Sequence, residues 1–240
     1  MLGTLRQDLK AARDRDPAAR SRLELVLCYP GIHAVWGYRV SHWLWLHDYK
    51  LLGRICSALT RLLTGVDIHP GAVLGSGLFI DHATGVVIGE TAEVGTDVTL
   101  YHGVTLGGSS LERGKRHPTI GDRVTIGAGA KVLGPIAVGD DSRIGANAVV
   151  VKPVPSDSVV VGVPGQVIHR KQHRLATGPP DLDNALMPDL VGVSLRALLD
   201  RIEDLETKVN GTGNGGQAQP HPPHRHPAGS EVWYQQDFSI

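Results

Sequence analysis

A branched apolar residue returns every six positions through the middle of this chain, and that period restricts the possible folds more than any other feature. A period of six is neither the 3.6 of an α-helix nor the 2 of an ordinary strand. It is the hexapeptide repeat of a parallel β-helix, in which each repeat supplies one short strand and one turn around a triangular core. Glycine follows eight of these residues and permits the tight corner. The thirteen residues in phase are Ile68, Leu74, Ile80, Ile88, Val94, Leu100, Leu106, Ile120, Ile126, Val132, Val138, Ile144 and Val150.

The rhythm divides the chain into three regions. Residues 1–64 are predicted to form an α-helical N-terminal domain, with a turn at Tyr29-Pro30-Gly31 and a Trp-rich helical stretch from there to about Leu63. Residues 65–168 are predicted to form a β-helix of just over four coils, which Pro153 and Pro155 end. What is known of such domains implies a left-handed coil. Residues 169–240 are predicted to be a tail with a short helix at 194–209, a disordered His- and Pro-rich linker and a terminal recognition peptide.

Charge and cysteine usage exclude several classes of protein. The chain has 24 basic and 24 acidic residues, so no broad basic face indicates nucleic-acid binding. Charged residues interrupt the most apolar N-terminal segment at short intervals, which argues against a membrane span. Cys28 and Cys56 lie in apolar helical surroundings, and no N-terminal signal is visible. We therefore expect a reduced, cytoplasmic protein.

Two interruptions of the rhythm are candidates for function. Two residues are added between Ile80 and Ile88, and eight are added between Leu106 and Ile120. A β-helix tolerates insertions only as loops that leave its corners, where function tends to lie. The longer insertion is therefore expected to form an arm that reaches over a neighbouring surface.

Three histidines near these interruptions suggest a site. His102 follows His82 by one coil plus the two added residues, so both are expected on one edge of the prism, and His117 is expected to converge there from the long insertion. Three imidazoles could bind Zn²⁺, as in β-helical carbonic anhydrases. Alternatively, His82 could act as a general base whose other ring nitrogen is oriented by a carboxylate. Asp67 and Asp81 flank this edge and favour the general base.

Several motifs resemble those of serine O-acetyltransferases. They are "DIHPGAVLGSGLFIDHATGVVIGETAEVG", "GVTLGG", "RHPTIGD", "IGAGAKVLG" and "VVGVPGQVI", with "RDPAA" and "PGIHAVWGYRVSHWLW" upstream. The resemblance covers roughly residues 14–168. It implies acetyl transfer from acetyl-CoA to the hydroxyl of L-serine, with no metal required. By motif it implies His82 as general base, Asp67 as its orienting carboxylate, Asp16 and Asp81 on the ammonium group, and Arg116 and His117 on the carboxylate.

The resemblance also implies a homotrimer with acetyl-CoA in a groove between adjacent prisms. Ala128 and Ala146, one coil apart, are the positions expected against the pantetheine arm. Arg143 and Lys152 are expected near the phosphates. The oxyanion donors are not identified by the sequence, and the backbone N–H of Gly108 is one candidate.

The final residues "DFSI" imply a partner. Related acetyltransferases end in isoleucine and insert that end into the active site of O-acetylserine sulfhydrylase, so Ile240 is expected to bind this enzyme. Feedback inhibition by L-cysteine is expected as well. Two other functions stay open at this point: a zinc carbonic anhydrase on the same fold, and a protein that mainly regulates the sulfhydrylase.

Overall fold

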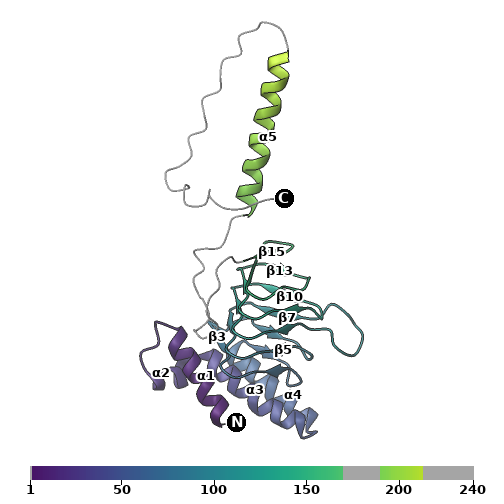
Figure 1. Ribbon diagram of the computed structural model, residues 1–240. Helices are drawn as coiled ribbons and strands as arrows, with labels where there is room; N and C mark the ends of the chain where they lie inside the picture. Colours follow the sequence, from purple (N-terminus) through teal and green to yellow (C-terminus); the bar gives the residue numbers. More distant parts are fainter. Residues whose placement is uncertain (1, 170–189, 213–240) are drawn as a thin grey trace. The chain divides into compact units, whose positions relative to one another are not determined.

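The computed structural model describes residues 2–169 and 190–212, which contain N-terminal helices, a parallel β-helix and a C-terminal helix (Figure 1). The predicted fold class, helices followed by a β-helix of hexapeptide repeats, is confirmed. No helix among the described residues is long and apolar enough to cross a membrane. The helices are α1 (Leu2–Arg15), α2 (Arg22–Cys28), α3 (Pro30–Leu46), α4 (Lys50–Thr64) and α5 (Leu190–Thr212).

The helix boundaries follow local chemistry. Ser21 caps α2 by accepting a hydrogen bond from the Glu24 N–H at 3.1 Å, and Pro30 begins α3. The predicted Trp-rich helical stretch consists of two helices, α3 and α4, because the chain turns at Asp48, which has a φ of 69°. Gly65 ends α4 in the left-handed conformation at a φ of 71°. The C-terminal helix α5 includes the predicted residues 194–209 and extends beyond both ends.

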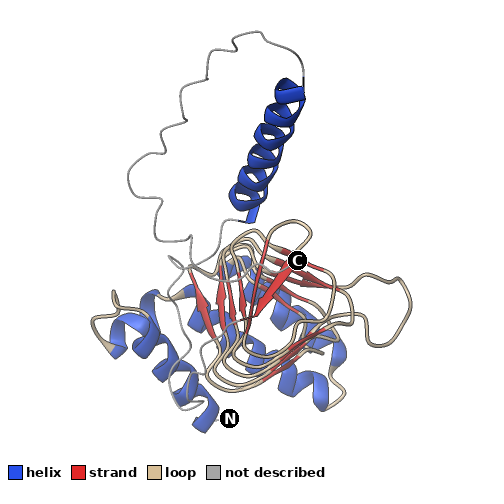
Figure 2. Ribbon diagram, turned by 45° about the horizontal axis from the view of Figure 1, so that its top comes forward, coloured by secondary structure: helices blue, strands red, loops and turns tan. Residues whose placement is uncertain are grey.

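The strands stack into three parallel sheets around the core, and they are seen as separate groups in Figure 2. The first sheet contains β1 (Asp67–Ile68), β4 (Val87–Ile88), β7 (Thr105–Gly107), β10 (Lys131–Leu133) and β13 (Val149–Val150). The second contains β2 (Val73–Leu74), β5 (Glu93–Val94), β8 (Thr119–Ile120) and β11 (Ala137–Val138). The third contains β3 (Phe79–Asp81), β6 (Thr99–Tyr101), β9 (Thr125–Ile126), β12 (Arg143–Ile144), β14 (Ser158–Val161) and the antiparallel β15 (Gln166–His169).

Strand register reproduces both interruptions of the sequence rhythm. In the regular coils, paired residues such as Thr125 and Arg143 are eighteen positions apart. Across the first interruption the separation grows to twenty, as between Phe79 and Thr99. Across the second it grows to twenty-six, as between Glu93 and Thr119. The added residues therefore leave as corner loops without disturbing the stack, and the longer loop projects between β7 and β8 (Figure 1).

All thirteen aliphatic residues in phase point into the core, and none is more than 6% exposed. A second buried column, which was not predicted, lies two positions before them and includes Val66, Ala72 and Leu78. The predicted end of the coils was also wrong. Val154 bridges to Val138 between the two prolines, and β14 then pairs with β12, so the β-helix runs for about five coils. Pro153 and Pro155 have no N–H to donate, but the coil needs only the N–H of Val154 between them, which donates to the carbonyl of Ala137 at 2.8 Å.

The N-terminal helices cover the open end of the β-helix. The first coil donates its N–H groups to the second coil and has no coil beneath to donate to its own carbonyls. Side chains of α3 and α4 take that place, which satisfies backbone groups that would otherwise be orphaned at a buried end. Ser57 donates to the carbonyl of Ile68 at 2.8 Å, Tyr38 to that of Ala72 at 2.6 Å, and Arg39 to that of Leu74 at 2.5 Å.

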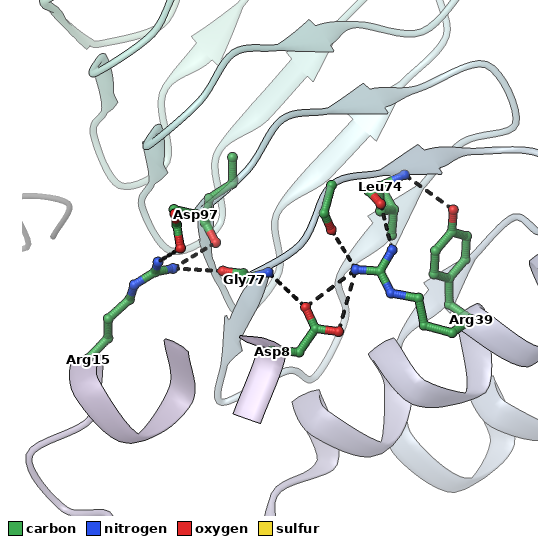
Figure 3. A network of polar contacts seen from close by, with 9 residues as sticks. Asp8, Arg15, Arg39, Leu74, Gly77 and Asp97 are labelled. Atoms are coloured by element: carbon green, nitrogen blue, oxygen red, sulfur yellow. Dashed lines mark hydrogen bonds and ion pairs between the residues drawn. The ribbon is translucent and has the colours of Figure 1, made fainter. Parts of the chain in front are cut away.

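A buried charge network fixes α1 to the same coil (Figure 3). The fully buried Asp8 accepts a hydrogen bond from the N–H of Gly77 at 2.9 Å and lies 3.4 Å from the Arg39 guanidinium. Arg15, at the end of α1, donates to the carbonyl of Gly77 at 3.0 Å and pairs with Asp97 at 2.7 Å. These contacts hold the end of α1 against the β-helix.

We expect Arg39→Met to lower the free energy of unfolding by about 3–5 kcal/mol, because it leaves Asp8 buried without its cation and uncovers two carbonyls. Chemical denaturation followed by circular dichroism measures this. Arg6→Met, on an exposed position of α1, is the matched control and should change stability little. Equal effects of the two substitutions would contradict a capping role for Arg39.

Candidate active site

The predicted site residues lie mainly on two edges of the prism. The histidine edge joins the third sheet to the first and comprises residues 82–85, 102–103, 128–129 and 146–147. The arginine edge joins the first sheet to the second and comprises residues 69–71, 89–91 and 108–117. Each strand of the first sheet begins at the histidine edge and ends at the arginine edge, so the width of that sheet separates the two.

His82 lies on the exposed bulge that the first interruption creates. Its backbone has a φ of 55°, as does that of Ala83, and its side chain is 75% exposed. The ring centroid lies 5.8 Å from that of His102, edge to face, which confirms that these two histidines share an edge. Its Nε2 atom lies 3.9 Å from the carboxylate of Asp81. The bulge therefore presents an accessible imidazole at a fixed corner beside a carboxylate.

A second carboxylate approaches this corner from the N-terminal region. Asp16, directly after α1, accepts hydrogen bonds from the N–H of Ala18 at 2.8 Å and from the hydroxyl of Tyr29 at 2.5 Å. Burial raises the pKa of Asp81; the charge of His82 opposes that rise, and the negative charge of Asp16 adds to it. Two carboxylates that repel each other make a favourable position for a cation.

Tyr29 is a residue that sequence reasoning did not assign to the site. The sequence predicts only a turn at this position, because the contact of Tyr29 with Asp16 joins two positions thirteen apart that no repeat relates. The hydrogen bond to the Asp16 carboxylate, with burial, raises the pKa of the Tyr29 hydroxyl to about 12. Tyr29 therefore stays protonated and continues to donate to Asp16.

Asp67 lies at the start of β1, near the histidine edge. Its carboxylate pairs with the guanidinium of Arg61, from the last turn of α4, at 3.2 Å. Within residues 2–169, no hydrogen bond or ion pair joins Asp67 to His82. The orienting role predicted for Asp67 thus stays a prediction.

Arg116 and His117 lie on the arginine edge, with Gly108. Arg116 pairs with Glu90 at 2.5 Å, and this hydrogen bond lowers the pKa of the Glu90 carboxyl. His117 as a residue is 8% exposed, and its ring contacts the Thr91 hydroxyl through Nδ1 at 2.8 Å. Burial and the nearby Arg116 lower the pKa of His117, so the ring is neutral at pH 7. A surface cavity of about 600 Å³ lies between Glu90, Arg116 and the projecting loop.

The expectation that His117 converges on His82 and His102 is therefore wrong for a single chain. His82 and His102 each follow a core residue of the third sheet by two positions, whereas His117 precedes the second-sheet residue Ile120 by three. Within the described residues, no group of three or more His, Cys, Asp or Glu side chains is placed to hold a metal ion. In this single chain, the width of the first sheet keeps the two halves of the predicted site apart.

The residues predicted to bind acetyl-CoA are distributed over both edges. Ala128 and Ala146 stack above His102 in one column, since Gly129 donates to the carbonyl of His102 and Asn147 to that of Ala128, each at 2.8 Å. Arg143 lies in β12, before that column, and is 3% exposed. Lys152 is exposed and follows β13, on the arginine side of the first sheet. Ile240 lies outside the described residues.

Comparison with known proteins gives consistent matches. The family model for bacterial transferase hexapeptide (six repeats) matches residues 117–152. A serine acetyltransferase of Mycobacterium tuberculosis is 61% identical over 240 residues, which are 100% of both chains. A solved serine acetyltransferase of Neisseria gonorrhoeae in complex with serine has a TM-score of 0.68 and 46% identity, over 70% of this chain and 68% of that one. A further solved structure, of a serine acetyltransferase in complex with cysteine, has a TM-score of 0.70 and 42% identity, over 71% of this chain and 66% of that one.

Proposed function

Because the chain belongs to the serine acetyltransferase family, we propose that it transfers the acetyl group of acetyl-CoA to the hydroxyl of L-serine, with His82 as the general base. The family resemblance predicted from the motifs is confirmed, and the comparisons give no support to a carbonic anhydrase. The observation that carries the mechanism is the exposed imidazole of His82 beside Asp81, with Asp16 close enough to raise the pKa of Asp81. Cys28 and Cys56 are free thiols, which supports a location in the reducing cytoplasm.

Serine would bind with its ammonium group at Asp81 and Asp16. An ammonium there neutralises the repulsion between the two carboxylates, and its hydrogen-bond donors match their oxygens. This binding position would leave the serine hydroxyl near His82. The hydrogen bonds from Tyr29 and Ala18 hold the Asp16 carboxylate in place for that contact.

The serine carboxylate would bind the arginine edge of a second copy. Arg116 offers a guanidinium that Glu90 already holds on one side, and His117 is fixed by Thr91. Since a single chain keeps the two edges apart, this proposal requires an oligomer in which each site takes one edge from each of two chains. A closed trimer would form three such sites.

The reaction would then need one proton transfer in each direction. His82 takes the hydroxyl proton while the serine oxygen attacks the thioester carbon of acetyl-CoA. The resulting tetrahedral oxyanion collapses with cleavage of the carbon–sulfur bond, and protonated His82 returns the proton to the departing CoA sulfur. Asp67 would stabilise the imidazolium, for which it must exchange its contact with Arg61. The Gly108 N–H stays a candidate oxyanion donor.

Acetyl-CoA would lie along the groove between two prisms. Ala128 and Ala146 continue the column that begins at His102, and their small side chains would suit the narrow pantetheine arm. Lys152 is exposed and could meet a phosphate. Arg143 is buried in this single chain, so its contact with a phosphate would require a side-chain movement.

The release of free CoA thiol from acetyl-CoA tests this function. The rate of release is measured in three mixtures, which contain L-serine, L-homoserine or no acceptor. Turnover that depends on L-serine, and is much weaker with the longer homoserine, is the expected result. Turnover independent of the acceptor would overturn the proposal.

Tyr29→Phe tests how Asp16 is positioned. Loss of the hydroxyl removes one hydrogen bond to Asp16, so we expect the KM for L-serine to rise about three- to tenfold with little change in kcat. Steady-state kinetics at saturating acetyl-CoA measure both constants. Tyr49→Phe, on an exposed tyrosine of the same domain, is the control. An unchanged KM would show that Tyr29 does not position the Asp16 carboxylate for substrate binding.

We also propose two regulatory partners. L-Cysteine differs from L-serine by one atom and could occupy the serine site as a feedback inhibitor, and a solved family member binds cysteine. The "DFSI" segment is proposed to enter the active site of O-acetylserine sulfhydrylase, where a carboxylate beside an apolar side chain imitates an amino acid.

Deletion of Ile240 is expected to abolish binding to the sulfhydrylase and to leave acetyl transfer unchanged. Removing one residue takes away the apolar side chain that the partner site would recognise and moves the carboxylate by one position. Titration calorimetry with purified sulfhydrylase measures the binding. A deletion variant that binds as tightly as the unaltered chain would contradict the recognition mode.

A further inference from the structure

The C-terminal helix α5 carries an apolar stripe with the spacing of a coiled coil. Leu195, Leu198, Ile202 and Leu205 alternate in steps of three and four, and each is between 51% and 59% exposed in the described chain. Val209 continues the same spacing. This spacing fixes one heptad assignment, with Leu195, Ile202 and Val209 at a positions and Leu198 and Leu205 at d positions.

We propose that α5 packs in parallel and in register against α5 of a second copy of this chain. The helix is 23 residues long, and in proteins most of the stability of a helix comes from burial of its apolar face. A second copy of the same stripe is a matching partner, because in a parallel arrangement each a or d residue meets its own counterpart.

The charges that flank the stripe select the parallel orientation. Arg201 lies at a g position and Glu206 at the following e position. In a parallel pair, the g residue of one helix faces the next e residue of its partner, so Arg201 would meet Glu206 of the other copy twice. In an antiparallel pair, g positions face each other, and Arg201 and Lys208 would place like charges together.

Ile202 and Val209 at a positions, with Leu198 and Leu205 at d positions, are residue types that pack in the core of parallel coiled coils. The opposite face carries Asp200, Glu203 and Asp204, which suits solvent.

Disulfide trapping in the full-length chain tests the pairing. In a background with Cys28→Ser and Cys56→Ser, Leu205→Cys places a thiol at a d position, and Thr207→Cys places one on the outer face. We expect mild oxidation to link Leu205→Cys chains into pairs at least about tenfold faster than Thr207→Cys chains.

Two further variants test whether rapid linking requires the apolar stripe to pack, or only that two α5 helices lie near each other. Leu198→Glu with Ile202→Glu should abolish the rapid linking of Leu205→Cys, while Ala197→Glu with Thr207→Glu adds the same charge to the outer face and should preserve it. Equal linking rates at positions 205 and 207 would overturn the proposal. So would a mixture in which Ile202→Cys links to Leu205→Cys faster than either links to itself, since a positions face d positions of the partner in an antiparallel pair. Acetyl transfer, measured in parallel, shows that each variant is folded, and the linking rates do not depend on the reaction proposed above.

Discussion

Replacing His82 by asparagine is expected to lower kcat for acetyl transfer to L-serine by about 10²- to 10⁴-fold, the usual contribution of a general base. Asparagine is the appropriate substitute because it tolerates the positive φ of 55° at this position, which most residues do not. The side chain is 75% exposed, so its loss should leave the fold intact. Release of CoA at saturating substrates gives kcat, and the KM for acetyl-CoA should change little.

His102→Asn is the matched control, because this ring lies on the same edge, 5.8 Å from that of His82. It has no role in the proposed proton transfer, and we expect its effect on kcat to stay below about tenfold. The reverse ranking would identify His102 as the base. In that case the bulge at residues 82–83 would serve to position a neighbour rather than to carry the base itself.

Most of the fold could be predicted because the period of six is a direct record of the coil. Each strand pairs with the strand one coil later, so the register separations of eighteen, twenty and twenty-six reproduce the regular repeat and its two interruptions. The prediction failed where the rhythm changes. Val154 and Val160 belong to the last coil but fall out of phase with Val150, and the prolines beside Val154 suggested an end that a single backbone hydrogen bond avoids.

The candidate site was less predictable because it depends on which edge each loop leaves. His117 lies on the arginine edge because its loop leaves the β-helix after the first-sheet strand β7, whereas His82 and His102 follow strands of the third sheet. The contact of Tyr29 with Asp16 and that of Arg61 with Asp67 could not be predicted from the repeat at all. Both come from the packing of N-terminal helices that follow no repeat, and no spacing in the sequence relates their partners.

Two inactive variants are expected to restore activity when they assemble together. His82→Asn removes the base from one edge, and Arg116→Ala removes the carboxylate ligand from the other, so each variant alone should be nearly inactive. If every site takes one edge from each of two chains, random assembly of equal amounts leaves about a quarter of the sites of a trimer with both edges intact. Co-expression of the two variants, followed by purification and measurement of kcat per chain, should give about a quarter of the activity of the unaltered enzyme.

A chain that carries both His82→Asn and Arg116→Ala, co-expressed with the unaltered chain, distinguishes sites shared between two chains from sites formed within one chain. Shared sites again predict about a quarter of full activity, because both contributing chains must be unaltered, whereas sites within one chain predict about half. Sites within one chain also predict no recovery from the two single variants. That pair of results would contradict the shared site and would require the projecting loop to carry Arg116 across the whole first sheet. The ion pair of Arg116 with Glu90 and the hydrogen bonds of the Arg116 and His117 N–H groups to the Thr91 hydroxyl oppose such a movement, because all of them tie these residues to the arginine edge.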